Sequence, residues 1–272
     1  MERAAGASID SAVPLRRDPD WLTLPAAAGR WWSLDLPVKN LRTELTARVW
    51  SPAQETARVL VVHDGPDYDK HAGLSRYVAA SITAGRIEPC HLVLLPAGDR
   101  FDWYAAFPAY ARGLGQEILP RLTDRLSPGR PVAGVGASLG ALAMLHCQRR
   151  HPESFAGLFL QSGSFFQPRF DRQESGFGRY LPIVRWTGRV MRADDGPGVP
   201  VTMTCGSLEE NLANNRSMAE ALRAQGYEVT LAQIEGGHDW PAWRDAFDPH
   251  LTALLRRIWP SGHPPHHRTT ND

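Results

Sequence analysis

The chain has 272 residues, of which 43% are hydrophobic and 22% charged, and its 30 Lys and Arg against 29 Asp and Glu leave a net charge of +1. This balance provides no electrostatic attraction to phosphate backbones or anionic lipid, which argues against nucleic-acid-binding and membrane-surface proteins. The hydrophobic content, with nine Trp, excludes a disordered chain, and the length suits one large α/β domain or two small ones.

Three widely spaced cysteines, Cys90, Cys147 and Cys205, form neither a disulfide framework nor a C-x-x-C metal site, so we expect buried hydrophobic residues. Residues 1–20 lack the apolar core of a signal peptide, and no run approaches the roughly 18 apolar residues of a membrane span. These features predict a cytoplasmic protein.

The first 28 residues have no periodic pattern and are predicted to be an irregular arm. Residues 30–37 and 41–50 then alternate between apolar and polar side chains. This alternation predicts two strands with one polar face, typical of the antiparallel edge of a sheet.

From residue 59 the pattern changes to short continuous apolar runs, separated by stretches with helical spacing. The runs are 59–62, 91–95, 131–135, 155–160, 199–204 and 227–234, and the helical stretches are about 71–84, 105–126, 139–150, 211–225 and 240–258. This alternation predicts an α/β domain over 29–259, with a mostly parallel sheet covered by helices on both faces.

Two segments do not fit the alternation. Residues 165–197 combine several aromatic residues with charges, and we expect a lid or pocket wall over the carboxyl edge of the sheet, where ligands of open α/β sheets bind. Residues 260–272 contain His263, His266 and His267 without strict ligand spacing, so disorder is expected there rather than a metal site.

The most specific chemical signal is Gly136-Ala137-Ser138-Leu139-Gly140. It follows a predicted apolar strand and opens a predicted helix, which is the context that a G-x-S-x-G nucleophile elbow requires. The strained turn would expose the Ser138 hydroxyl, and small flanking residues would let backbone approach backbone. At the start of a helix, the Leu139 N–H is a natural oxyanion donor.

A serine hydroxyl needs a base near neutral pH, and His238 is the best placed of the ten histidines. It lies in the glycine-rich loop after the last predicted strand, whereas the other candidates lie within or beside strands and helices directed elsewhere. Because parallel strands end at one edge of a sheet, this loop should lie on the same side as Ser138.

The imidazole needs an acid, which in α/β-hydrolases lies between the nucleophile and the histidine in chain order. The strand before the last one is followed by Glu209 and Glu210. Glu209 is our preferred candidate, with Glu210 as the alternative. Both could also be simple charges at a helix N-terminus.

A second oxyanion donor should come from the loop after the first parallel strand. Pro66 has no N–H there, so the donor must be Gly65, Asp67 or Tyr68. We take Gly65, which permits a sharp turn, as the candidate, although the sequence does not choose among the three.

Taken together, these segments resemble the enterochelin-esterase-like branch of the α/β-hydrolases, which is related to esterase D, the feruloyl esterases and the mycolyltransferases. The resemblance runs from about residue 55 to 258. It rests on His63-Asp64-Gly65, Arg100–Tyr104, the Ser138 elbow, Ser162–Phe165, Gly206–Asn211 with Asn215-Arg216, and Gly236–Trp240 with Trp243.

The resemblance implies an ester hydrolase with Ser138 as nucleophile, His238 as base and Glu209 as acid. It also implies that Arg100 lines the substrate pocket, and we expect Tyr104 and Trp240 to bind substrate with it. Two departures stand out: Asp102-Trp103-Tyr104 replaces the usual acid–Tyr pair, and a proline at position 66 removes an N–H that relatives use in the oxyanion hole.

The leading functional prediction is a serine carboxylesterase that hydrolyses a small-molecule ester or lactone, with siderophores among the candidates. No cofactor, metal, nucleic acid or membrane is required, and the oligomeric state is not indicated. An acyltransferase or thioesterase of a biosynthetic pathway is the alternative. A non-catalytic binding protein on a hydrolase scaffold is disfavoured, because an idle site need not contain all of Ser, His and Glu.

Overall fold

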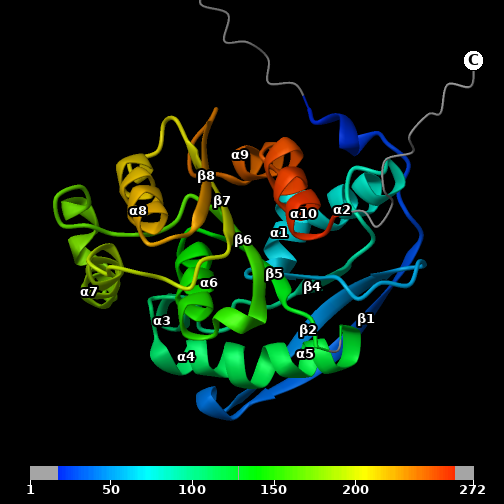
Figure 1. The fold of residues 1–272 in the computed structure, drawn as a ribbon, viewed down its shortest axis with the longest axis horizontal. Coiled ribbons are helices and arrows are strands. Elements are labelled where there is room, and N and C mark those ends of the chain that lie inside the picture. The colour runs from blue at the N-terminus through cyan, green and yellow to red at the C-terminus, as the bar shows by residue number, and fades with distance from the viewer. Residues whose placement is uncertain (1–17, 128, 261–272) are drawn as a thin grey trace, which may run out of the picture.

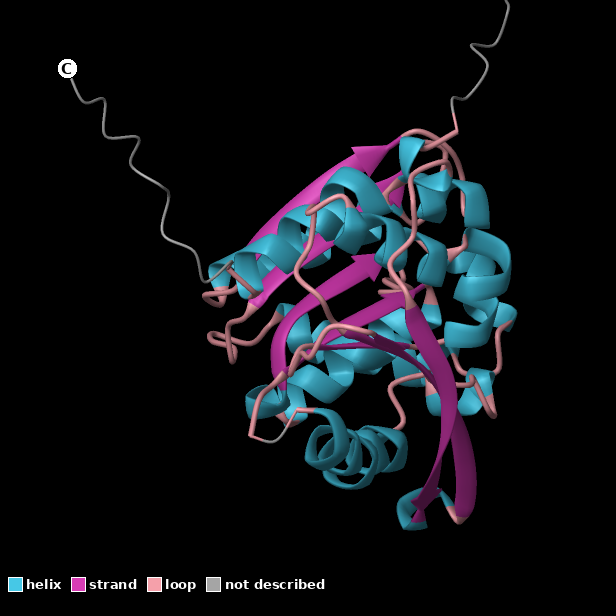
Figure 2. Ribbon diagram, turned by 90° about the vertical axis from the view of Figure 1, so that its right-hand side faces the viewer, coloured by secondary structure: helices cyan, strands magenta, loops and turns pink. Residues whose placement is uncertain are grey.

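The computed structural model describes residues 18–127 and 129–260, which build one eight-stranded sheet between two layers of helices (Figures 1 and 2). The strands follow the order β1-β2-β4-β3-β5-β6-β7-β8 across the sheet. Their bounds are β1 Gly29–Val38, β2 Thr43–Pro52, β3 Val59–Val62, β4 His91–Leu94, β5 Val132–Ala137, β6 Phe155–Gln161, β7 Pro200–Gly206 and β8 Glu228–Ile234.

The N-terminal strand pair forms the antiparallel edge that the sequence predicts. β1 and β2 pair from Gly29 opposite Pro52 to Val38 opposite Thr43, and β2 continues antiparallel onto β4. Along the first part of β2, buried residues alternate with exposed ones, because only one face packs on the core. β2 begins two residues later than predicted, since Lys39–Leu41 form a 3-10 turn.

The strands from β3 to β8 are parallel, as predicted. Every residue of β3 and of β5 is buried, which is expected where helices cover both faces. The helices are α1 Gly65–Ala72, α2 Leu74–Thr83, α3 Arg100–Trp103, α4 Pro108–Gly113, α5 Leu119–Leu126, α6 Leu139–Arg150, α7 Tyr180–Met191, α8 Leu212–Ala224, α9 Trp240–Asp245 and α10 Thr252–Ile258.

These helices divide between two hydrophobic cores. Helices α4 to α8 pack on one face of the sheet, and α1, α2, α9 and α10 pack on the other (Figure 1). Several predicted helices are interrupted: α1 and α2 meet at Gly73, whose φ of 64° ends a helix, and a π-helical segment separates α4 from α5. Helix α7 lies inside the segment that breaks the sequence pattern.

The predicted arm and tail fall largely outside the described residues, among them His263, His266 and His267. The described end of the arm is packed against the domain. Trp21 is fully buried, with its ring 5.5 Å from Tyr77 and 6.2 Å from Phe247.

Candidate active site

Ser138 stands between β5 and α6 in a backbone conformation that residues with a side chain rarely adopt, with φ 56° and ψ −124°. The turn is so tight that a Cβ at position 136 would lie 2.4 Å from the Gly140 carbonyl oxygen, which explains the glycine there. Leu139 is the first residue of α6, so its N–H has no acceptor within the helix. The local geometry is that of a nucleophile elbow.

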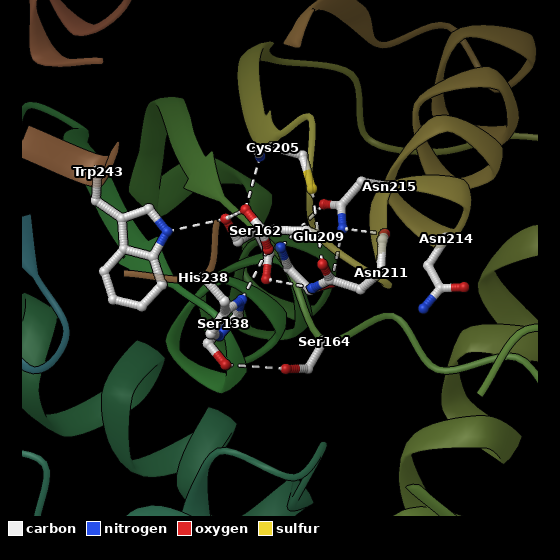
Figure 3. Close-up of polar contacts among 12 residues, drawn as sticks. Ser138, Ser162, Ser164, Cys205, Glu209, Asn211, Asn214, Asn215, His238 and Trp243 are labelled. Carbon is white, nitrogen blue, oxygen red and sulfur yellow. Dashed lines mark hydrogen bonds and ion pairs between the residues drawn. The ribbon is translucent and has the colours of Figure 1, made fainter. Parts of the chain in front are cut away.

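Two further candidate residues meet at the same edge of the sheet. Glu209 follows β7 and His238 follows β8, and His238 Nδ1 lies 2.7 Å from Glu209 Oε2 (Figure 3). The Glu209 side chain is 1% exposed, whereas that of His238 is 43% exposed. Glu210, the alternative acid, is exposed and instead accepts a hydrogen bond from Gln173 at 3.1 Å.

The buried Glu209 carboxylate is held by several donors. Its Oε1 accepts from the Ser162 hydroxyl and from the Gly206 N–H, both at 2.6 Å. Burial raises the pKa of Glu209, but the hydrogen bonds from His238, Ser162 and Gly206 outweigh it, so the pKa lies below its ordinary value. Glu209 is therefore ionised near neutral pH, with its negative charge beside the His238 imidazole.

Ser162 is a supporting residue to which the sequence analysis gave no role. Its hydroxyl accepts from Trp243 Nε1 at 2.9 Å while it donates to Glu209 (Figure 3). Asn211 and Asn215 hold the adjacent backbone by bonding the Ser162 and Gly163 carbonyls, each at 3.0 Å. The position of Ser162 just after the predicted strand 155–160, at the carboxyl edge of the sheet, is the sequence signal that could have identified it as a site residue.

Ser138, Leu139 and His238 line one cavity of about 480 Å³. In this structure the Ser138 hydroxyl lies 3.2 Å from the Ser164 hydroxyl, another residue of the cavity wall (Figure 3). Part of the segment predicted as a lid or pocket wall also borders the cavity. The aromatic residues that line it are Phe101, Phe166 and Phe177, and the acidic ones include Asp171, Glu174 and Glu210.

Arg100 lines this cavity, whereas two other predicted substrate contacts do not. Tyr104 is fully buried, with its ring stacked on His63 at 4.6 Å and under the Arg100 guanidinium at 5.8 Å. Trp240 packs on Tyr68, His71 and Trp243. Neither Tyr104 nor Trp240 lines the described cavity, because both rings pack against other side chains. The prediction that they contact substrate is thus not supported.

The predicted second oxyanion donor is engaged elsewhere. The Gly65 N–H donates to the Leu95 carbonyl at 2.9 Å, because α1 begins directly after β3 and turns this N–H toward the end of β4. This bond speaks against Gly65 as the donor. The neighbouring Asp64 carboxylate instead accepts from Arg100 Nε, with both oxygens at 3.0 Å.

His63 forms a buried support beneath the elbow. Its Nδ1–H donates to the Gly140 carbonyl at 3.0 Å, and its Nε2 accepts from the Tyr110 hydroxyl at 2.9 Å. Burial lowers the pKa of His63 to about 4, against a raising effect of the Gly140 bond and with a small further lowering by Arg100. The imidazole is therefore neutral near pH 7 and serves as a structural brace.

Within residues 18–127 and 129–260, no cluster of three His, Cys, Asp or Glu side chains has the arrangement of a metal site. Over the same described residues, no helix combines the length and apolar character needed to cross a bilayer.

Comparison with solved structures identifies the fold. The enterobactin esterase of Shigella flexneri, solved in the presence of enterobactin, superposes with a TM-score of 0.72 at 19% identity, covering 90% of this chain and 63% of that one. A ferulic acid esterase superposes with a TM-score of 0.70 at 19% identity, covering 86% and 99%. The fold is that of the α/β-hydrolases.

The chain belongs to the Esterase family, whose model, described as "Putative esterase", matches residues 39–254. It is 27% identical to the iron(III) enterobactin esterase of Dickeya dadantii, over 86% of this chain and 62% of that protein. The corresponding Escherichia coli K12 enzyme is 23% identical, over 81% and 56%. The chain thus spans about three fifths of the length of these relatives.

Proposed function

We propose that this esterase uses Ser138, His238 and Glu209 as a catalytic triad and passes through an acyl-enzyme. Ser138 Oγ attacks the ester carbonyl carbon while His238 Nε2 takes the hydroxyl proton. The same proton then passes to the departing alkoxide. A water molecule, deprotonated by His238, attacks the acyl-enzyme, releases the acid and restores the Ser138 hydroxyl.

The observation that carries this proposal is the 2.7 Å bond between His238 and the buried Glu209 at the cavity of Ser138. A carboxylate can only accept, so His238 Nδ1 carries the hydrogen and Nε2 remains free to take a proton. The Leu139 N–H supplies one oxyanion donor at the start of α6. The Ser138 hydroxyl must leave Ser164 and turn to His238 before attack, a tightening expected when substrate binds.

The proposed substrate is an aromatic ester or lactone. A cavity of about 480 Å³ has the size of a small-molecule site, and three phenylalanines line it. Residues 166–177 supply much of its wall, in keeping with a pocket segment. Because the curated relatives are named iron(III) enterobactin esterases, iron(III) enterobactin is the substrate to test first.

The test combines fluorophosphonate labelling, followed by intact-protein mass spectrometry, with turnover of a short-chain aryl ester. We expect stoichiometric labelling that Ser138→Ala abolishes and Ser164→Ala retains. Labelling of the Ser138→Ala protein would place the nucleophile elsewhere. Complete labelling with almost no hydrolysis would indicate an acyltransferase that needs a different acceptor.

A further inference from the structure

The loop that should complete the oxyanion hole has no free backbone donor. The His63 and Gly65 N–H groups donate to the carbonyls of Val135 and Leu95, at 3.0 and 2.9 Å. The N–H groups of Asp67 and Tyr68 both donate to the Asp64 carbonyl at 3.0 Å, and Pro66 has none. The remaining N–H, that of Asp64, is directed at the buried Tyr104 hydroxyl at 3.4 Å.

A tetrahedral intermediate nevertheless needs more than the single Leu139 donor, because its oxygen carries a full negative charge. The surroundings increase this need. Of the described side chains that line the cavity, the only basic ones are Arg100 and His238, and His238 is already assigned to proton transfer. The acidic ones are Asp171, Glu174, Glu209 and Glu210. Without a cationic donor, these carboxylates would oppose the negative charge that forms during attack.

Arg100 is held beside the elbow by two contacts. Its Nε donates to both carboxylate oxygens of Asp64 at 3.0 Å, and its guanidinium lies over the Tyr104 ring at 5.8 Å. The Asp64 carboxylate itself lies against the first turn of α6, since a Cβ at Gly140 would meet Asp64 Oδ2 at 3.2 Å. The Asp64 carboxylate therefore lies between the guanidinium and the turn that contains Ser138 and Leu139.

The outer edge of this guanidinium is available to a ligand. The Arg100 side chain is 30% exposed and lines the cavity, whereas that of Asp64 is only 5% exposed and does not line it. No described residue accepts a hydrogen bond from the Nη atoms of Arg100. Their N–H groups are thus preorganised donors without an acceptor, as an oxyanion site requires.

We propose that an Arg100 Nη–H is the second oxyanion donor of this enzyme, in place of a loop N–H. The inference rests on the proposed Ser138 mechanism. As Ser138 Oγ bonds to the carbonyl carbon, the carbonyl π electrons move to oxygen, which then accepts from Leu139 N–H and Arg100 Nη–H. Arg100 keeps its protons throughout. Asp64 and Tyr104 are positioning residues, because they act only through the guanidinium.

The experiment must separate this role from simple binding of anionic substrates. We compare Arg100→Ala on 4-nitrophenyl acetate, which is neutral, and on 4-nitrophenyl hemisuccinate, which is anionic. Loss of an oxyanion donor should reduce kcat about 100- to 1,000-fold on both esters, with KM for the neutral ester little changed. Added guanidinium chloride at tens of millimolar should restore part of kcat, whereas sodium chloride at the same ionic strength should not.

The matched control is Arg179→Gln, because Arg179 is also ion-paired to an aspartate, Asp102, but does not line the described cavity. Its kinetics should equal those of the parent. If Arg100→Ala fails to fold, Arg100→Lys replaces it, because one ammonium cannot reproduce the two edges of a guanidinium. Unchanged kcat on the neutral ester in a folded Arg100 variant would overturn the inference, whereas hydrolysis by Ser138→Ala would overturn the proposed mechanism instead.

Discussion

Two groups of residues flank Ser138 and differ in their hydrogen bonding: the acid side, with Glu209 and His238, and the oxyanion side, with the loop after β3 and Arg100. On the acid side, every acceptor has its donor: Glu209 is buried and bonded to His238, Ser162 and Gly206. On the oxyanion side, the N–H groups of the loop after β3 are already bonded to the loop itself or to neighbouring strands and Tyr104, whereas the Arg100 guanidinium is 30% exposed.

The difference follows from what each side must do. Orienting a base requires a fixed acceptor, so full satisfaction of hydrogen bonds is useful there. Stabilising a charge that exists only during reaction requires donors that are fixed in place but still unpaired. A satisfied network and an unsatisfied one can therefore both be preorganised.

Breaking the acid side at its centre should have the largest effect. Glu209→Gln removes the negative charge that stabilises the imidazolium, and we expect kcat to fall about 1,000- to 10,000-fold. Glu210→Gln changes the adjacent carboxylate, which lines the cavity but is bonded to Gln173 rather than to His238, and it should lose far less. Steady-state kinetics on an aryl ester measure both. Equal and small losses would mean that Ser138 and His238 work without an acid.

His63, which lies buried beneath the Ser138 turn, should make the stability of the protein depend on pH. The folded pKa of His63 is about 4 and its ordinary value 6.5, so below pH 6.5 the unfolded chain takes a proton that the folded chain refuses. The contribution of neutral His63 to the free energy of unfolding is therefore fully present above pH 6.5. It falls as the pH drops toward 4 and then levels off. From pH 7 to pH 5, His63 alone should remove roughly 2 kcal/mol from the free energy of unfolding.

Urea titrations of the parent and of His63→Gln at both pH values measure this share. Burial also lowers the pKa of His146 to about 4, so that histidine contributes a similar decrease, which remains in the variant. The variant should be less stable at pH 7 but should lose about 2 kcal/mol less on acidification. An identical pH dependence in the two proteins would contradict a neutral His63.

The smallest of these effects concerns the edge of the acid network. Ser162→Ala removes one donor from the Glu209 carboxylate, and we expect about a tenfold loss of kcat with KM unchanged. The pKa of Glu209 should rise, because one of the hydrogen bonds that lower it is lost. Ser207→Ala, at an exposed serine, serves as the control. An unchanged kcat in a folded Ser162→Ala protein would show that this hydroxyl only fills space.

Local patterns of the sequence were enough to predict the main architecture. Continuous apolar runs predicted the parallel strands, and alternation predicted the antiparallel edge formed by β1 and β2. Because parallel strands end on one side, chain order also brought Ser138 and His238 to a common edge. The helix interruptions were not predicted. Gly73 lies at the α1–α2 break and Gly115 lies within the π-helical segment, but an isolated glycine in a helical pattern is often tolerated.

What the tertiary structure decided was the direction of individual groups. Glu209 and Glu210 are neighbours in the same loop, and only packing sends one toward His238 and the other toward Gln173. The sequence suggested Gly65 as a donor, but its N–H is used by Leu95, thirty residues away in the chain. Tyr104 likewise does not face the cavity: its buried ring packs under the Arg100 guanidinium. Sequence periodicity reports local burial, whereas the availability of a donor depends on partners distant in sequence that only the folded chain brings together.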